Sequence, residues 1–401
     1  MKQLTQLFRG NLACLALLLF SCTGENPEIV LPERLDLFDR FATQTVGGGS
    51  VLPEETVTIK FFPGSVEFLA TGKRGQVNHL KLDESQAELL GAFTVPEVFP
   101  APGEVGLTSV AFHPDFEDNQ FLFMCFTTGD NKWNRIIRLK WSKDYAAVVA
   151  SIKTVIDIDR VFPDEPQHGL YDLCFGDDGM LYAAIGDATQ PEFSQDKKSL
   201  LGKLIRIAPR LDEAGGYDVP ADNPYFGDAQ ARPEIAAVGL RTPWRILAHE
   251  DKIYIAEVGE NSFEEIELYT PERRNFGWPL CEGHCDDARF SNPVFTISHQ
   301  DAFYQTEDPE PAISNRLSVS LGVVYPVSGH DPYNDLLDGR LLLNDVFQGF
   351  VRAAEVAPNG ALIDDQHIFH YDFVTSMALG PDGFIYGSTI FDSHIFRIVL
   401  K

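Results

Sequence analysis

The sequence predicts an all-β protein, a six-bladed β-propeller built from four-stranded antiparallel blades. Short apolar strands with two-residue alternation are joined by turns that contain Asp or Gly, and such pairs recur at roughly 50–70 residues. Helical patterns are nearly absent. A β-sandwich with long loops is the alternative, but its hairpins would not need to share one turn signature. The recurring units begin at Val57, Leu107, Leu170, Trp244, Gly339 and Thr375.

The first residues have the pattern of an export signal. Lys2 and Arg9 precede the apolar run LACLALLLF, which is too short for a comfortable membrane span. The following Ser21–Cys22 resembles a bacterial lipobox, so we expect cleavage before Cys22 and a lipid anchor on its thiol; a plain secretory signal is the alternative. The expected product is a periplasmic or outer-membrane/cell-surface lipoprotein. The expected organisation is a signal peptide at 1–21, a tether at 22–50 and the propeller at 51–401.

Composition limits the classes of partner. The chain has 401 residues, a formal net charge of −27 and 44% hydrophobic residues. Nucleic acid and anionic membrane surfaces both attract cationic proteins, so this charge argues against either as a partner. The acidic residues are spread along the chain, as on a solvated surface.

The cysteines fall into two kinds. Cys125 and Cys174 lie inside apolar runs and are expected to be buried and unpaired. Cys281 and Cys285 flank a short loop, where an exported protein could form a local disulfide. A zinc site there is the weaker alternative, because no second pair of ligands has suitable spacing.

One hairpin carries a candidate base. In QHGLYDLCFGDDGMLYAAIGD, His168 precedes the first strand and Asp187 follows the second. Antiparallel strands joined by a tight turn bring their far ends together, so both residues should emerge on one face of the blade. A histidine that only orders its loop is the alternative.

An ordered series of segments resembles the glucose/sorbosone dehydrogenase family. The segments are EVGLTSVAFHPDF (104–116), the histidine hairpin (167–187), LLGKLIRIAP, YDVPADNPYF, PEIAAVGLRTPWRI, YIAEVGENSFEEIELY and NFGWPLCEG. The resemblance extends from about residue 57 to the C-terminus. Members of this family are six-bladed quinoproteins that use pyrroloquinoline quinone (PQQ) and calcium.

The resemblance implies a role for the histidine hairpin. Oxidation of a sugar at its anomeric carbon requires loss of the hydroxyl proton while a hydride leaves the carbon, and a neutral imidazole suits the proton step. The family's base matches His168. The carboxylate that would orient it matches Asp187.

Further site residues are implied by the same resemblance. Arg241 would pair with a carboxylate of PQQ, although a guanidinium stacked to close a blade is an equal alternative. Thr242 stands where the family usually has asparagine, and Glu104 where some members have glutamine. The backbone carbonyls of Gly259 and Glu260 would ligate calcium.

Several positions depart from the family pattern. The Lys and Arg residues that late blades normally direct at PQQ have no clear counterparts here, apart from Arg340 and Arg352. Glu264 and Glu265 are expected on an acidic rim, with calcium ligation as the alternative. Trp278 is expected to serve packing and turn formation.

The sequence therefore predicts PQQ- and calcium-dependent oxidation of aldose sugars to lactones, with a small-molecule sugar substrate and an unassigned electron acceptor. The alternative is a non-catalytic propeller that has lost its PQQ contacts and binds a carbohydrate or a protein partner. Hedgehog-interacting proteins of animals resemble the same family and use the fold for binding. The loss of late-blade cations favours the alternative, whereas the His168–Asp187 pair favours the enzyme.

Overall fold

A computed structural model describes most of the chain, and the residues that it describes belong to one unit, Leu37–Lys401. The expected signal, the lipid site at Cys22 and most of the tether lie outside the described residues. In the described part, no helix has the length and apolar character needed to cross a membrane. The described residues are 37–38, 40–83, 86–101, 103–162, 164–300, 317–327 and 331–401.

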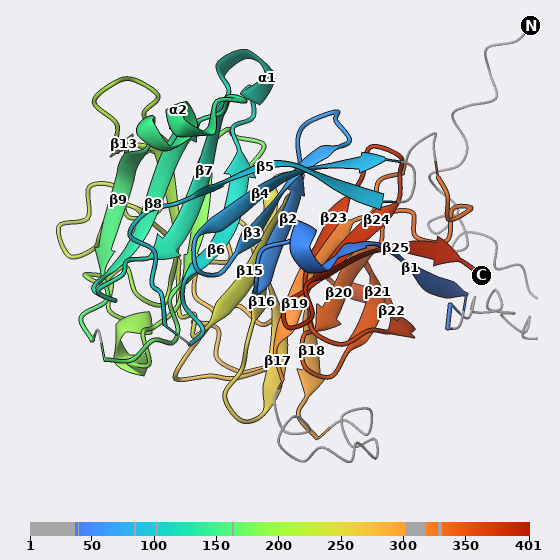
Figure 1. The fold of residues 1–401 in the computed structure, drawn as a ribbon. Helices are drawn as coiled ribbons and strands as arrows, with labels where there is room; N and C mark the ends of the chain where they lie inside the picture. The colour runs from blue at the N-terminus through green and yellow to red at the C-terminus, as the bar shows by residue number, and fades with distance from the viewer. Residues whose placement is uncertain are drawn as a thin grey trace, which may run out of the picture. The chain divides into compact units, whose positions relative to one another are not determined.

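The unit is a six-bladed β-propeller, which confirms the predicted fold (Figure 1). The first strand of each sheet contacts the first strands of both neighbouring sheets, so the inner strands form a closed ring. Blade 1 contains β2 (Thr56–Phe61), β3 (Glu67–Gly72), β4 (Gln76–Asp83) and β5 (Gln86–Thr94). Blade 2 contains β6 (Leu107–Phe112), β7 (Phe121–Thr127), β8 (Trp133–Lys140) and β9 (Lys153–Asp159). Blade 3 contains β10 (Leu170–Phe175), β11 (Leu181–Ile185), β12 (Lys203–Pro209) and β13 (Tyr217–Asp218), with β14 (Ile235–Val238) also paired to β12.

The remaining blades follow the same plan. Blade 4 contains β15 (Pro243–His249), β16 (Lys252–Glu257), β17 (Phe263–Tyr269) and β18 (Phe295–Ser298). Blade 5 contains β19 (Val319–Val324), β20 (Leu341–Asp345), β21 (Phe350–Val356) and β22 (Leu362–His370). Blade 6 contains β23 (Val374–Leu379), β24 (Ile385–Thr389), β25 (His394–Leu400) and β1 (Phe41–Gly48). The short helices are η1 (Gly49–Val51), α1 (Phe116–Asn119), α2 (Tyr145–Ala150) and η2 (Pro191–Ser194).

Blade 6 joins the two ends of the propeller. β1 pairs antiparallel with β25, from Phe41 opposite Leu400 to Gly48 opposite His394. This pairing covers an edge that β25 would otherwise expose. β1 lies inside the segment 22–50 expected as a tether, so the folded unit begins before residue 51.

The turn signature seen in the sequence has a physical cause. In blade 3, Asp178 accepts a hydrogen bond from the Tyr182 hydroxyl at 2.9 Å, and Gly179 takes the positive φ of 74° that the turn requires. In blade 6, Asp382 accepts from Tyr386 at 2.7 Å in the same way. The Asp-Gly turn is thus closed by a tyrosine four residues after the aspartate.

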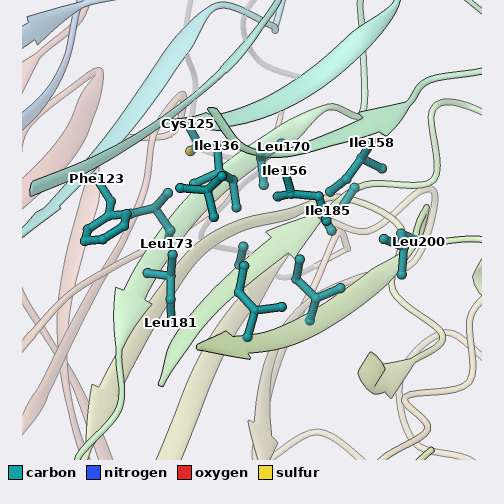
Figure 2. Close-up of a cluster of buried hydrophobic side chains, with 14 of the residues drawn as sticks. Phe123, Cys125, Ile136, Ile156, Ile158, Leu170, Leu173, Leu181, Ile185 and Leu200 are labelled. Carbon is teal, nitrogen blue, oxygen red and sulfur yellow. The ribbon is translucent and has the colours of Figure 1, made fainter. Parts of the chain in front are cut away.

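Apolar side chains fill the space between neighbouring blades. Figure 2 shows this packing at blades 2 and 3, where Phe123 and Ile136 of blade 2 lie in one cluster with Leu173, Leu181 and Ile185 of blade 3. All five side chains are at most 3% exposed. Burial of such surface is the main favourable contribution to the stability of the fold.

One buried arginine links the inner strands. Arg245 on β15 donates to the Val57, Thr108 and Thr375 carbonyls at 2.8, 3.0 and 3.1 Å, which belong to three other inner strands. The three carbonyls satisfy most of the donors of a guanidinium that has left water. The same three residues line the cavity described below, so Arg245 stabilises the part of the cavity wall that the inner strands form.

The described cysteines have the bonding states expected from the sequence, although Cys174 is less buried than expected. Cys281 and Cys285 form a disulfide. Cys125 is buried and Cys174 is half-buried, and both are free.

Candidate active site

A cavity of about 730 Å³ lies at one end of the inner strands. Most of its lining residues come from two equivalent positions in the blades: the segment before the first strand and the segment after the second strand. The first group includes Glu55, Glu104, His168, Arg241, Thr242, Leu317 and Ser318. The second group includes Lys73, Gly259, Glu260, Val346, Phe347, Ile390 and Phe391. The predicted site residues therefore come together, with Asp187 directly behind the lining.

His168 and Asp187 form the pair that the hairpin geometry predicts. The His168 Nδ1 and Asp187 Oδ1 atoms lie 2.6 Å apart. Asp187 is 1% exposed and His168 is 8% exposed, so the carboxylate holds the inner side of the imidazole while the ring reaches the cavity. Because an ionised carboxylate only accepts, Nδ1 carries the proton and Nε2 keeps a lone pair.

The backbone around the pair is strained and tightly packed. His168 has φ 47° and the residues after Asp187, Ala188 and Thr189, have φ 55° and 64°, a left-handed region that side chains disfavour. The Ala188 N–H donates to the His168 carbonyl at 3.1 Å and fixes this arrangement. Gly186 is required here, because a Cβ at this position would lie 2.7 Å from the His168 carbonyl group. Such local strain is typical of functional sites.

Asp187 is held by two further donors. The Trp278 indole N–H donates to Oδ2 at 2.9 Å, and the Thr189 N–H donates to Oδ1 at 2.9 Å. Donors that converge on a carboxylate stabilise its charged form. Trp278, expected only to pack, is thus part of the site.

Arg241 reaches the cavity from the segment before β15. Its Nη1 donates to the Val258 and Gly259 carbonyls at 3.2 and 3.0 Å, and its guanidinium lies over the Trp278 ring at 5.6 Å. Arg241 therefore stacks on Trp278 and also lines the cavity. Its backbone is anchored by Glu257, whose Oε1 accepts from the Arg241 N–H at 2.6 Å.

Gly259 and Glu260 form a tight turn at the cavity edge. A Cβ on Gly259 would lie 1.8 Å from the Phe263 carbonyl oxygen, so only glycine fits. The Glu260 N–H donates to Glu282 Oε1 at 3.0 Å, which orders the turn. The Gly259 carbonyl already accepts from Arg241, and a carbonyl oxygen has a second lone pair for a cation.

Glu104 lies beside a cation that was not singled out in the sequence. Lys73 also lines the cavity; it is 9% exposed, and its Nζ contacts the Gly103 carbonyl and lies 3.9 Å from Glu55. Burial lowers the pKa of Lys73, whereas the charges of Glu55 and Glu104 act in the opposite direction. Glu104 also accepts from the Tyr171 hydroxyl at 3.0 Å. A lone lysine after a strand carries no motif, so only the folded ring reveals its position.

Glu264 and Glu265 are buried, so the expectation of an acidic rim is wrong. Glu264 is 1% exposed and accepts from His299 Nε2 and the Val319 N–H, both at 2.9 Å. Burial lowers the pKa of His299, but the hydrogen bond and charge of Glu264 outweigh it, and the net pKa is raised. Glu265 is 6% exposed, and its Oε1 accepts from the Gly283 N–H.

Glu265 should make stability depend on pH. Burial raises its pKa from 4.5 to about 8, so the fold favours the protonated acid. This contribution is fully present below pH 4.5 and is lost as pH rises to about 8. In calcium-free protein, Glu265→Gln should therefore raise the melting temperature at pH 8 relative to the parent, with a much smaller gain at pH 5. Thermal melts across this range measure the effect. The matched control is exposed Glu272→Gln; equal shifts at both pH values would contradict the assignment.

The wall contributed by blades 5 and 6 is mainly apolar. Arg340 donates to Asp364 at 3.1 Å and Arg352 donates to Asp365, and neither arginine lines the cavity. Arg340 and Arg352 therefore do not take the place of the Lys and Arg residues that the late blades of the family direct at PQQ. The side chains that blades 5 and 6 present instead are mostly Leu317, Val346, Phe347, Ile390 and Phe391.

The fold and site define a propeller with a carboxylate-held histidine in its central cavity. The family profile "Glucose / Sorbosone dehydrogenase" matches residues 54–392, and the chain belongs to this family. The matched family is named for sugar dehydrogenases.

Individual relatives agree with this assignment. The chain is 26% identical to the aldose sugar dehydrogenase YliI of Escherichia coli (strain K12) over 82% of this chain and 85% of that protein. It is 29% identical to the HIPL1 protein of Arabidopsis thaliana over 57% of this chain, but spans only 38% of that relative. The solved PQQ-bound aldose sugar dehydrogenase of Streptomyces coelicolor matches 90% of this chain and 99% of its own with a TM-score of 0.69, and at 20% identity it shows the shared fold.

Proposed function

We propose that this protein oxidises aldose sugars to lactones with PQQ and calcium. The observation that carries the proposal is the His168–Asp187 contact of 2.6 Å at the wall of the central cavity. An E. coli relative is an aldose sugar dehydrogenase and an Acinetobacter calcoaceticus relative is a quinoprotein glucose dehydrogenase, which supports both the substrate class and the cofactor.

His168 is the base of this reaction. Its Nε2 takes the proton of the anomeric hydroxyl while the hydride leaves C1, and C1 becomes the lactone carbonyl carbon. Asp187 keeps Nδ1 protonated and stabilises the imidazolium that forms. Trp278 and Thr189 hold the carboxylate in place during this transfer. When bound, PQQ supplies the quinone that accepts the hydride.

The donors in the cavity fit a planar anionic cofactor. Arg241 and Lys73 provide two cations for its carboxylates, and the apolar side chains of blades 5 and 6 provide contact for a flat ring. Among the described residues, blades 5 and 6 contribute no Lys or Arg to the lining, so we expect binding to depend strongly on Arg241 and on calcium.

The Gly259–Glu260 turn fits a calcium ion. Its backbone carbonyls are the hard oxygen ligands that calcium prefers, and the Glu260 carboxylate lies in the same cavity lining. Bound there, calcium would add positive charge next to Arg241 and offset the acidity of Glu104.

Arg241→Met should weaken PQQ binding. Loss of a charge-assisted contact to a carboxylate costs about 1.5–3 kcal/mol, which corresponds to roughly 10- to 150-fold in Kd. Titration of PQQ into calcium-loaded protein lacking residues 1–22, followed by absorbance, measures the change. Arg340→Met is the matched control and should bind as the parent does.

Equal affinity of Arg241→Met and the parent would remove Arg241 from the cofactor site. Absence of saturable PQQ binding by the parent would contradict the proposed function and favour a propeller that binds a carbohydrate or a protein. We further propose that the chain is exported and that its only membrane attachment is the lipid at Cys22.

A further inference from the structure

A fully buried lysine lies in the blade that carries the candidate base, at the strand end that leads to Asp187. Lys203 is the first residue of β12 and is 0% exposed. In the sheet it is opposite Ile185 of β11 and Val238 of β14, at the strand ends nearest the cavity. Asp187 follows β11 by two residues. The mechanism proposed above makes no use of this lysine.

Backbone carbonyls surround the Lys203 ammonium group. Nζ donates to the carbonyls of Phe193, Leu201 and Ser194 at 2.6, 2.7 and 3.1 Å. These three acceptors match the three N–H donors of an ammonium group. Burial lowers the pKa of Lys203 from 10.5 to about 7, even though the charges of Asp196 and Asp187 act in the opposite direction. The carbonyls also favour the charged form, since they accept from each N–H.

One of the carbonyls that Lys203 binds belongs to Ser194, which holds the segment that leads to Arg241. The Ser194 hydroxyl donates to the Leu240 carbonyl at 2.7 Å, and the Ser194 carbonyl accepts from the Gly239 N–H at 2.9 Å. These contacts fix the chain that leads into Arg241. The Arg241 carbonyl in turn accepts from the Asp187 N–H at 2.9 Å.

A second path leads from Lys203 to the hairpin of the base. Gly202, which precedes the lysine, donates its N–H to the Gly186 carbonyl at 3.0 Å. Gly186 directly precedes Asp187. Lys203 and its neighbour Gly202 thus contact both the strand end that leads to Asp187 and the segment that leads to Arg241.

We propose that Lys203 positions the His168–Asp187 pair through its buried ammonium group. Besides fixing the two segments, its positive charge attracts the Asp187 carboxylate that holds the imidazole. This inference rests on the proposed role of His168 as the base. The experiment below tests it without requiring the protein to oxidise a sugar.

The charges around the pair must be held constant in such a test. Arg160 faces the histidine loop from blade 2, where its Nη2 donates to the Gln167 carbonyl at 2.8 Å. Among the described residues, Asp196 acts on the lysine, and the other charged or titratable groups that line the same cavity as His168 are Glu55, Lys73, Glu104, Tyr171, Arg241, Glu260, Glu264 and His299. None of them is altered in the variants below.

Lys203→Met removes the charge and keeps most of the side-chain volume. The imidazole titration of His168, followed by NMR and assigned through His168→Ala, should have a midpoint higher by roughly half a pH unit or more, because a nearby cation is gone. The acid limb of any sugar-oxidation pH profile should move in the same direction. The exposed Lys198→Met is the control and should leave the midpoint unchanged.

A folded Lys203→Met protein with an unchanged His168 midpoint would overturn the inference. If this variant does not fold, the ¹⁵N signal of Lys203 Nζ in the wild-type protein tests it instead: an exchange-protected ammonium is expected at pH 6, below the lowered pKa of about 7, and a neutral amine at that pH would overturn the inference. A shifted midpoint in a protein that oxidises no aldose would sustain the role of Lys203 and reject the proposed function.

Discussion

His168→Ala is expected to reduce sugar-dependent dye reduction by the PQQ- and calcium-loaded protein by about 10²- to 10⁴-fold, the usual contribution of a general base. The variant removes the imidazole, which lines the cavity, and leaves Asp187, which lies behind the lining. The loss should appear in kcat, because the base acts on the reacting hydroxyl. PQQ binding should change little.

The chain offers a matched control for this substitution. His370 and Asp372 form a second histidine–aspartate contact at 2.9 Å, but both side chains are more than half exposed and lie outside the cavity lining. His370→Ala should retain parental activity. Comparable losses in both variants would mean that the effect is structural and would remove His168 from the chemistry.

Asp187→Asn is expected to reduce kcat by about two to three orders of magnitude. An amide donates to Nδ1 where the carboxylate accepted from it, so the imidazole shifts its proton to Nε2 and loses the lone pair that faces the sugar. The Trp278 indole N–H also loses a carboxylate acceptor. Steady-state kinetics with an aldose panel and the ¹⁵N shifts of the His168 ring measure the two effects.

Trp278→Phe helps to interpret that result. It removes one donor from the carboxylate but leaves the Asp187–His168 contact and the tautomer intact. We expect a smaller loss of activity than in Asp187→Asn. Full activity of Asp187→Asn, with the ring protonated on Nδ1, would show that the aspartate does not select the tautomer.

Local sequence patterns predict the features that depend on neighbouring strands. Alternation and Asp-Gly turns indicate the blades, and the His168–Asp187 contact follows from one hairpin, since its ends are joined by the pairing of Leu170 with Ile185. The sequence placed Glu104, Arg241 and Gly259 in one site only through a resemblance. Their convergence depends on closure of the ring.

Other contacts could not be read from the sequence. Trp278 is separated from Asp187 by 91 residues and reaches it from blade 4. Lys73 lies on blade 1, without a motif around it. Glu264 and Glu265 look like surface charges, because carboxylates are rarely buried without compensation. In the fold, two hydrogen-bond donors compensate the burial of Glu264. For Glu265, burial raises the pKa of the carboxyl group, so that the neutral acid is favoured.

The most direct test of the proposed function is an anaerobic mixing experiment with calcium-loaded protein that has bound PQQ. An aldose is added, and the absorbance of the bound cofactor is recorded for the parent and for His168→Ala. Rapid conversion of the oxidised to the reduced cofactor spectrum is expected in the parent, and a strongly slowed conversion in the variant. A stable oxidised spectrum in the parent with every aldose tested, despite saturable PQQ binding, would contradict the proposed function.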